Sequence, residues 1–522
     1  MNSKTAEPVI KALDPTDANG AGEAVLAFER APAQGRTPRA GHSIGPRLQE
    51  LRAGGRSVRV SRGIGRRLRE LRADDARMVA VRESWRALWS SRLLIWAVGV
   101  GTVLTLGFGP TRGAFDPPGV TRGLGSVGNV LAAPVARWDS AWYLVIAHYG
   151  YRPDLGSYTA PRDAFFPLYP LALKAVSWLG APPVLAGVLI SLLALAFALY
   201  GIHRLTTLEL GRSGETARLA VMLTAFAPMA FFLSAVYSES LYLALSVGLF
   251  WCARQGRWAL VGVLGALAAA TRSAGIVLLL PALMIYLYGP REDRLPDSLP
   301  GPPEDDRSGF ASGPVGVRRS SFGRLDVSRL RPRYRLRLDV AWLGLLPLGI
   351  VIYGLALALG GGDVLAPFHA QGVWGRHFAG PYLGVWDGLK AAFEGLRQLL
   401  SLQSRHVYFS AGEGSPTVSA SHNLMLFAFL AAAIPAFIAA LRRLPLAYGL
   451  YAVAALALPL SYPVASQPLM SLPRFLIVLF PLSIGAAAWL AERPRLVRPM
   501  LAGSGLLMSF FLAQFATWHW VA

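Results

Sequence analysis

The chain has 522 residues, of which 53% are hydrophobic and only 16% are charged, with a formal net charge of +21. This composition is too apolar for an ordinary soluble domain and predicts an all-α polytopic membrane protein. The single cysteine, Cys252, excludes an intrachain disulfide framework and any metal site built from several cysteines. The basic residues lie mainly beside apolar runs, where they set orientation and contact anionic lipid, so we expect no nucleic-acid partner.

Residues 1–91 are polar and rich in arginine, and they lack the apolar stretch of a secretory signal peptide. We expect a disordered basic region on the cytoplasmic side. A short repeat within it, residues 44–53 and 64–73, fits two interpretations. Each copy could form a basic amphipathic helix on anionic lipid, or the whole tail could serve only to fix topology, which its composition favours.

Apolar runs of near-spanning length recur from residue 92 onward and predict a bundle of about 11 transmembrane helices. A first transmembrane module, 92–288, is followed by the loop 289–337, which lacks apolar periodicity and is expected to be disordered in the cytoplasm. A second module, 338–522, contains a long external loop, 361–422. The expected spans are 92–110, 182–203, 216–234, 238–254, 257–271, 273–288, 338–360, 423–441, 445–462, 474–491 and 499–519.

Basic residues concentrate in alternate loops, and the positive-inside rule places those loops in the cytoplasm. We therefore expect a multi-pass protein of the cell membrane with a cytoplasmic N-terminus. Within the first external segment, residues 143–151 and 171–179 are too short to cross the bilayer and are expected to form interfacial helices. The external segments are 111–181, 234–240, 271–273, 361–422 and 461–473.

The first external segment contains an acid, a base and three aromatic residues close together. A carboxylate such as Asp139 beside the hydrocarbon boundary needs a partner or a task. It could pair with Arg137 or cap the helix that follows. The neighbouring Trp138, Trp142 and Tyr143 have flat faces that suit sugar rings, although such residues are also ordinary at membrane boundaries.

Three further polar residues lie at expected helix ends on the same side. Glu239 is in a tight turn, where it could be solvated or could cap a helix. Arg272 interrupts an apolar stretch, where an arginine costs roughly 3 kcal/mol, so it needs an anion: either Glu239 or a phosphate. Arg474 begins another apolar run and could instead extend to the interface. These residues suit an enzyme acting on an anionic lipid-linked substrate, although a transporter or lipid flippase could present the same set.

Five motifs between about residues 137 and 480 resemble, in order, the GPI mannosyltransferase 2 (PIG-V) family. They are Arg137-Trp138-Asp139-Ser140-x-Trp142-Tyr143 with Ile146-Ala147-x-x-Gly150-Tyr151, Phe165-Phe166-Pro167-Leu168-Tyr169-Pro170, Tyr237-Ser238-Glu239-Ser240-Leu241, Ala270-Thr271-Arg272-Ser273-x-Gly275 and Leu472-Pro473-Arg474-Phe475. The resemblance implies a GT-C-like bundle, an integral membrane glycosyltransferase whose site lies on the non-cytoplasmic face. The basic N-terminal region and the loop 289–337 have no counterpart in it.

The resemblance also implies a mannosyltransferase that uses a polyprenyl-phosphate sugar donor. We expect the acceptor to displace the phosphate in one step, which inverts the anomeric centre. By the match, Asp139 is the catalytic base, and charge and position assign Arg272 and Arg474 to the donor phosphate. The composition is typical of bacteria, which are not expected to make GPI anchors, so only a glycolipid or glycan acceptor in the membrane is implied. The expected substrate-binding residues are Arg137, Trp138, Trp142, Tyr143, Tyr169, Glu239, Arg272 and Arg474.

No cofactor is required, and no spacing in the chain is a metal signature. His148, Asp163 and Glu239 could hold a divalent metal only if folding brings them together. A non-catalytic subunit that retains the fold is a further alternative. The loop 361–422 is the expected place for acceptor recognition, through His369, Trp374, Arg376, His377, Trp386 and His406.

Overall fold

The computed structural model describes residues 56–109, 125–151, 162–211, 214–294, 332–405, 407 and 415–522. The expected all-helical architecture is confirmed: these ranges contain no strand, and only Arg376 and Val464 form an isolated antiparallel bridge. The chain divides into two units, Met1–Arg69 and Glu70–Ala522. The second unit contains all of the contacts described below.

The helices up to the loop 289–337 are α1 (Arg56–Leu106), α2 (Gly125–Ala132), α3 (Ser140–Tyr149), η3 (Arg162–Ala164), α4 (Leu168–Trp178), α5 (Pro183–Leu210), α6 (Gly214–Ala225), η4 (Ala230–Leu233), α7 (Glu239–Arg254), α8 (Trp258–Ala269), η5 (Ser273–Leu278) and α9 (Leu279–Tyr288). The later helices are η7 (Leu338–Leu345), α10 (Leu348–Leu359), α11 (Ala366–His369), η8 (Ala370–Trp374), α12 (Pro381–Ser401), α13 (Pro416–Arg443), α14 (Leu446–Leu460), α15 (Leu472–Leu476), α16 (Phe480–Leu490) and α17 (Pro494–Ala516).

The expected count of about 11 transmembrane helices is not confirmed. Among the described residues, 4 helices are long and apolar enough to cross a membrane, or up to 5 if η7 and α10, which meet at 41°, form one span. The 4 helices are Asp75–Leu106, Pro183–Leu210, Pro416–Arg443 and Pro494–Ala516. Other apolar segments, such as α8 and α14, form helices of 10–17 residues. These are shorter than the roughly 20 residues that a straight span needs.

Helix α1 begins well before the first expected span. Residues 1–55 of the region expected to be disordered, including the first repeat copy, lie outside the described residues, but 56–91 are helical. The prediction of disorder is therefore wrong for 56–91. Residues 75–91 contain good helix formers and neither glycine nor proline. The buried positions Ala80, Ser84, Ala87, Leu88 and Ser91 recur at helical spacing, so one face of this segment packs against the protein.

The two segments expected to be interfacial are helical, but their position at a membrane surface is not confirmed. Every residue of α3 from Ser140 to Ala147 is buried, so protein rather than lipid headgroups encloses that helix. Helix α4 exposes Leu171 and Trp178, and its position relative to lipid stays a prediction. Most of the loop expected to be disordered, 295–331, lies outside the described residues.

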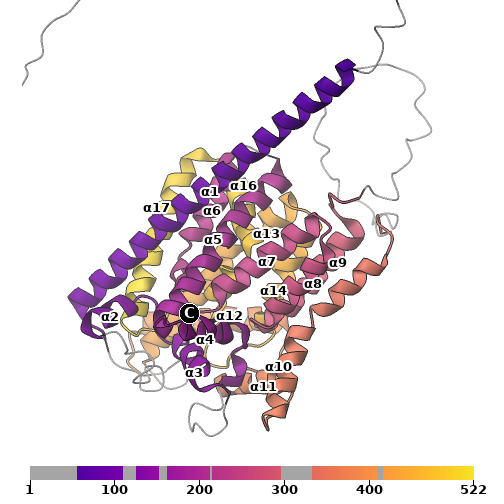
Figure 1. The fold of residues 1–522 in the computed structure, drawn as a ribbon. Helices are drawn as coiled ribbons and strands as arrows, with labels where there is room; N and C mark the ends of the chain where they lie inside the picture. The colour runs from indigo at the N-terminus through magenta and orange to yellow at the C-terminus, as the bar shows by residue number, and fades with distance from the viewer. Residues whose placement is uncertain are drawn as a thin grey trace, which may run out of the picture. The chain divides into compact units, whose positions relative to one another are not determined.

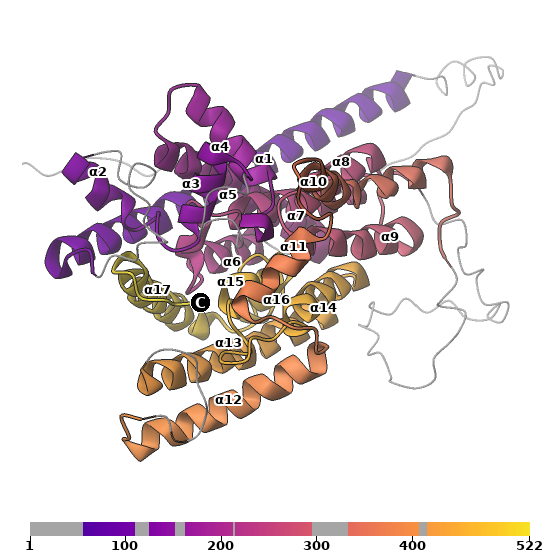
Figure 2. The same cartoon turned by 90° about the horizontal axis from the view of Figure 1, so that it is seen from below.

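Helices from both predicted transmembrane modules pack into one unit. Helix α6 contacts α16, and α9 contacts α14. Figure 1 shows α2, α3, α4 and α11 gathered toward one end of this unit, close to the C-terminus. Figure 2 shows α12, α13, α14, α16 and α17 on one side and most of the earlier helices on the other, with the short helices α11 and α15 between them. Segments distant in sequence therefore meet at this end.

Candidate active site

Asp139 lies in the turn that leads into α3, and its position is fixed by Tyr237. The Asp139 backbone N–H donates to Tyr237 Oη at 3.1 Å, and the Tyr237 hydroxyl donates to the Arg137 carbonyl at 3.0 Å. The carboxylate does not cap α3; instead, Arg474 Nη1 donates to Asp139 Oδ2 at 2.5 Å. From the sequence, Asp139 could pair with Arg137 or cap the helix that follows. In the structure it pairs with Arg474 instead.

Glu239 begins α7, where the positive end of the helix dipole favours a carboxylate. Its side chain is almost completely buried, and its Oε1 lies 2.8 Å from Arg272 Nη1 and 3.1 Å from Arg474 Nε. One carboxylate therefore joins two arginines that are distant in sequence. Arg474 also pairs with Asp139, so the four predicted charged groups form one connected network.

Arg272 lies in the tight turn between α8 and η5, and this turn requires a glycine at residue 275. The Gly275 N–H donates to the Arg272 carbonyl at 2.8 Å. A Cβ at Gly275 would lie 2.2 Å from the Ala269 nitrogen, so any larger residue would collide with the end of α8. The tight turn directs Arg272 toward Glu239 and over the ring of Phe475, whose centroid is 5.2 Å from the guanidinium carbon.

Arg376 is a third arginine at the same place, and the sequence assigned it only to acceptor recognition. Its Nη1 and Nη2 donate to the carbonyls of Tyr462 at 3.2 Å and Met470 at 3.4 Å. Among the described residues, no carboxylate forms an ion pair with it. Burial and the nearby Arg474 lower the pKa of Arg376 to about 10, so the group is still charged at neutral pH. Its positive charge is therefore available to a bound anion.

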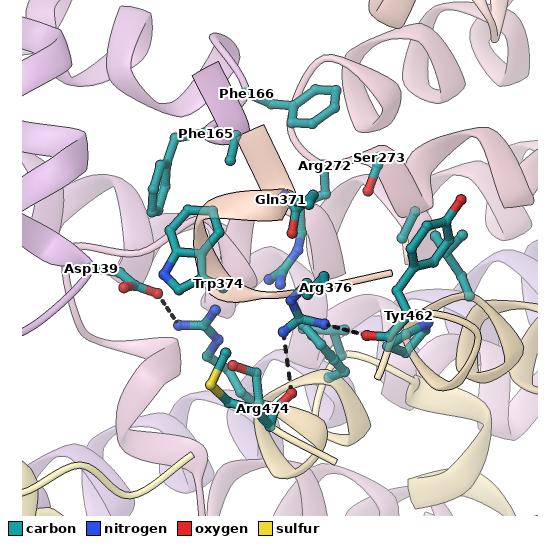
Figure 3. A pocket seen from close by; sticks show the side chains of 18 of the residues that line it. Asp139, Phe165, Phe166, Arg272, Ser273, Gln371, Trp374, Arg376, Tyr462 and Arg474 are labelled. Atoms are coloured by element: carbon teal, nitrogen blue, oxygen red, sulfur yellow. Dashed lines mark hydrogen bonds and ion pairs between the residues drawn. The ribbon is translucent and has the colours of Figure 1, made fainter. Parts of the chain in front are cut away.

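The network borders a cavity of about 530 Å³. Asp139, Arg272, Arg376 and Arg474 line it, and Figure 3 shows Trp374 beside the Asp139–Arg474 pair. Several aromatic side chains line its walls, among them Trp138, Tyr143, Phe165, Phe166, Trp374, Phe475 and Trp520. Burial, then the charge of Glu239, raises the pKa of Tyr143 to about 12, so the phenol is neutral and can hydrogen-bond but cannot act as an anion.

The turn that carries Asp139 is held by the C-terminal segment. Trp138 has φ of +55°, in the left-handed region that a bulky residue rarely adopts. Its ring contacts those of Trp518 and Trp520 edge-on, with centroids 5.8 Å and 5.3 Å away. Arg137 Nε donates to the Ala516 carbonyl, and its guanidinium lies 4.9 Å from the Trp518 ring. These contacts stabilise a turn that a tryptophan at this position would otherwise disfavour.

The predicted substrate-binding residues divide into two groups. Trp138, Tyr143, Arg272 and Arg474 line the cavity with Asp139, and Glu239 is joined to it through the two arginines. Arg137, Trp142 and Tyr169 do not line it. Trp142 stacks on Phe165, and the buried Tyr169 contacts the Tyr143 ring edge-on, so both support the cavity wall from behind.

The loop expected to recognise the acceptor contributes Trp374 and Arg376 to the cavity. His369 instead pairs with Asp363 at the surface, Trp386 is exposed on α12, and His377 borders a separate hollow. His406 lies outside the described residues. Within the described ranges, no three His, Cys, Asp or Glu side chains come together as a metal site, so His148, Asp163 and Glu239 do not assemble.

The family described as Mannosyltransferase (PIG-V) matches residues 114–287. Three curated relatives, each named GPI alpha-1,6-mannosyltransferase 2, are also similar. The protein of Rattus norvegicus is 32% identical over 177 residues, covering 31% of this chain and 34% of the relative. That of Mus musculus is 32% identical over 157 residues, covering 28% and 30%. That of Cricetulus griseus is 34% identical over 179 residues, covering 31% and 34%.

The chain thus spans about a third of the length of the curated relatives it matches. No solved structure matches it. The matched region carries Asp139, Glu239 and Arg272, whereas Arg376 and Arg474 lie beyond the residues that the family matches. The resemblance drawn from the motifs is therefore confirmed: over residues 114–287, the chain is similar to the mannosyltransferase (PIG-V) family.

Proposed function

We propose that this protein is an integral membrane mannosyltransferase. It would take mannose from a polyprenyl-phosphate donor and transfer it, with inversion, to a hydroxyl of a glycolipid or glycan acceptor. The observation that carries the proposal is the meeting of Asp139, Arg272, Arg376 and Arg474 at one aromatic cavity. The similarity of residues 114–287 to mannosyltransferases supports the same reaction class.

The balance of charge at the cavity favours a donor with one phosphate. The three guanidiniums of Arg272, Arg376 and Arg474 are accompanied by two carboxylates, so the described charged groups leave one positive charge. A phosphodiester between polyprenol and sugar carries one negative charge and would neutralise it. A nucleotide diphosphate sugar carries more negative charge and would be left partly uncompensated in a buried site. Arg376 is the residue best suited to the phosphate because no carboxylate among the described residues pairs with it.

In the proposed step, Asp139 removes the proton from the acceptor hydroxyl. The acceptor oxygen forms a bond to the anomeric carbon while the bond from that carbon to the phosphate oxygen breaks. The electron pair goes to the leaving polyprenyl phosphate, whose second pKa is about 6, so it needs little protonation. Arg272 and Arg474 stabilise the charge that grows on this phosphate, since donors fixed in advance cost no reorganisation during the reaction. Arg376 binds the phosphate of the donor before the reaction.

The aromatic walls suit the sugar itself. Phe165 contacts Trp374 at 6.2 Å and Tyr143 at 5.2 Å between ring centroids, so these rings support one another. Flat apolar faces of this kind exclude water and pack against the C–H faces of a hexose. A water-poor site also limits hydrolysis of the donor.

We place the cavity on the non-cytoplasmic side of the cell membrane. Glu239 and Arg254 begin and end α7, whose 16 residues separate the cavity from a basic helix end by about 24 Å. Arg442 and Arg443 likewise end α13, far from its start near the external loop. Basic residues at these ends support a cytoplasmic position for them.

The proposal is tested in membranes that contain the protein and supply endogenous acceptors. Radiolabelled polyprenyl-phosphate mannose and GDP-mannose are offered separately, and labelled products are separated from the donor. We expect transfer from the lipid donor alone, with a product anomer opposite to that of the donor. Asp139→Asn should abolish most of the transfer, whereas Asp387→Asn, on the surface of α12, should leave it intact.

Equal transfer by wild type and Asp139→Asn would remove this carboxylate from the mechanism. Failure to transfer label from either donor would end the proposal of a mannosyltransferase. Movement of intact donor across the bilayer without loss of its sugar would instead favour a lipid flippase.

A further inference from the structure

Helix α12 was not expected from the sequence and has three distinct faces. The first consists of small residues that approach neighbouring backbone: Gly384, Gly388, Ala392 and Gly395 are all buried. A Cβ at Gly384 would lie 1.9 Å from the Leu460 carbonyl, and one at Gly395 would lie 2.8 Å from that of Ala420. This face therefore packs closely on the protein.

The second face is a stripe of large apolar side chains that the protein leaves exposed. Phe393 is 61% exposed and Leu400 is 74% exposed. The members recur every three or four residues, which places them on one side of the helix. They are Leu383, Trp386, Leu389, Phe393, Leu396 and Leu400.

The third face is charged. Asp387 and Glu394 are seven residues apart and so share one side of the helix, with Lys390 between them. These residues border a hollow of about 180 Å³ together with His377 and Asn423. The charged groups therefore lie along one flank of the apolar stripe.

The contacts of α12 show where it runs relative to the apolar helices. Gly384 touches Leu460, the last residue of α14, whereas Gly395 touches Ala420 in the second turn of α13. Figure 2 shows α12 beside α13 at the edge of the unit. Helix α12 thus packs beside α13 and contacts the beginning of α13 and the last residue of α14, the ends of these helices that are expected on the external side.

Neither the bilayer centre nor bulk water suits this helix. A transmembrane position would bury Asp387, Lys390, Glu394 and Arg397, at roughly 3 kcal/mol for each central charge. An aqueous position would expose the whole apolar stripe. The boundary between headgroups and acyl chains accommodates both faces. The adjacent candidate span α13 exposes Val418 and Ile434, so the apolar surface beside α12 already has the character of a lipid-facing one.

We propose that α12 lies in the membrane interface, with its apolar stripe among acyl chains and its charged face in the headgroup region. This assignment does not depend on the reaction proposed above. Arg376 precedes α12 by only a few residues, and the Ala379 N–H donates to the Ser461 carbonyl at 2.9 Å. Anchoring α12 in lipid therefore holds the Arg376 side of the cavity at headgroup depth.

The test places a spin label at single positions along α12. Cys252 is the only cysteine, so Cys252→Ala provides a background free of thiols. Labels are attached through Phe393→Cys or Leu389→Cys on the apolar stripe and through Glu394→Cys or Lys390→Cys on the charged face. The full-length protein is then reconstituted in vesicles of equal parts phosphatidylethanolamine and phosphatidylglycerol. Phe197→Cys, on an exposed position of the candidate span α5, reports contact with acyl chains.

Collision of each label with oxygen, which concentrates in lipid, is compared with collision with a water-soluble nickel chelate. We expect the oxygen-to-nickel ratio at 393 to exceed that at 394 by about fivefold and to approach that at 197, since acyl chains exclude the chelate. Equal, water-like ratios at 393 and 394 would overturn the proposal. Spin–spin coupling at 393 that falls on dilution into excess lipid would also overturn it, by showing that a second copy covers the stripe.

Discussion

Two of the ion-pair clusters among the described residues lie at opposite ends of α7, and they differ in charge balance and in the space beside them. At the cavity, Asp139, Glu239, Arg272 and Arg474 are joined, and Arg376 adds a further positive charge. At the other end of α7, Glu209 Oε1 lies 2.5 Å from Arg254 Nε and accepts from Tyr448 Oη at 2.8 Å. The second cluster joins α5, α7 and α14 with one carboxylate and one guanidinium, so its charges balance.

This difference separates a structural cluster from a candidate catalytic one. A balanced buried pair needs no further partner, and removing one member leaves an uncompensated charge. The cavity cluster has an excess positive charge and about 530 Å³ of space beside it, so we expect a bound anion to complete it. Burial alone does not distinguish the two clusters; charge balance and adjacent volume do.

The largest effect on transfer is expected for substitution of Asp139, in contrast to substitution of Glu209. Asp139→Asn should lower transfer by 10²–10⁴-fold, the usual range for losing a general base, about 3–5 kcal/mol of barrier. Thermal unfolding in detergent should change little because Arg474 keeps Glu239 as a carboxylate partner. The measurement is the rate of transfer per folded molecule. If the variant lost folded protein to the same extent as it lost activity, Asp139 would be a structural residue like Glu209.

Glu209→Gln should show the opposite pattern. The change leaves Arg254 charged and buried without its carboxylate, which typically costs about 3–5 kcal/mol of stability. We expect a lower unfolding temperature but unchanged transfer by each folded molecule. The double variant Glu209→Gln with Arg254→Met should regain part of the stability, since no lone charge remains. If Glu209→Gln lost transfer but unfolded at the same temperature as wild type, the contrast between the two clusters would be wrong.

Arg376 should affect binding of the donor more than the chemical step. Arg376→Gln removes the uncompensated charge and should raise the donor KM by about 10–100-fold, because a hydrogen bond to a charged group is worth about 1.5–3 kcal/mol. Arg376→Lys keeps the charge and should recover part of the affinity. Steady-state kinetics over a range of donor concentrations measure this, and an unchanged KM in Arg376→Gln would remove the residue from donor binding.

The smallest effect is expected at Trp520, which touches Trp138 rather than the network of charges. Trp520→Leu should lower kcat a few-fold, since one aromatic pair contributes about 0.5–1.5 kcal/mol. Trp178→Leu is the matched control because Trp178 is exposed on α4. Equal kcat values for the two variants would show that the C-terminal segment does not position Asp139.

Much of the site could be predicted from sequence because each charged residue interrupts an apolar segment. Asp139, Glu239, Arg272 and Arg474 were expected to share one side of the membrane, and the structure brings all four together. Their individual partners were not predictable, since Arg137 is adjacent to Asp139 in sequence but turns toward Ala516. Ion-pair choice depends on helix packing rather than on sequence separation.

Arg376 and α12 are two features of the structure that the sequence pattern did not predict. Arg376 lies in a polar loop among other cations, where nothing in the spacing marks it as part of the cavity. Helix α12 combines small, apolar and charged residues in three faces, so it matches neither a spanning helix nor an ordinary two-faced amphipathic one. Helix α1 was also missed before residue 92, because its charged residues suggested disorder although they are good helix formers.

The sequence by itself determined the helical class, the apolar segments and the four charged motifs, because these follow from the cost of placing polar groups in lipid. Only the tertiary structure decided that Arg474 rather than Arg137 pairs with Asp139, and that Arg376 joins the cavity. It also decided that Trp142 and Tyr169 support the cavity wall. The reason is physical: hydropathy acts on each segment separately, whereas charge pairing and cavity formation depend on which segments pack together.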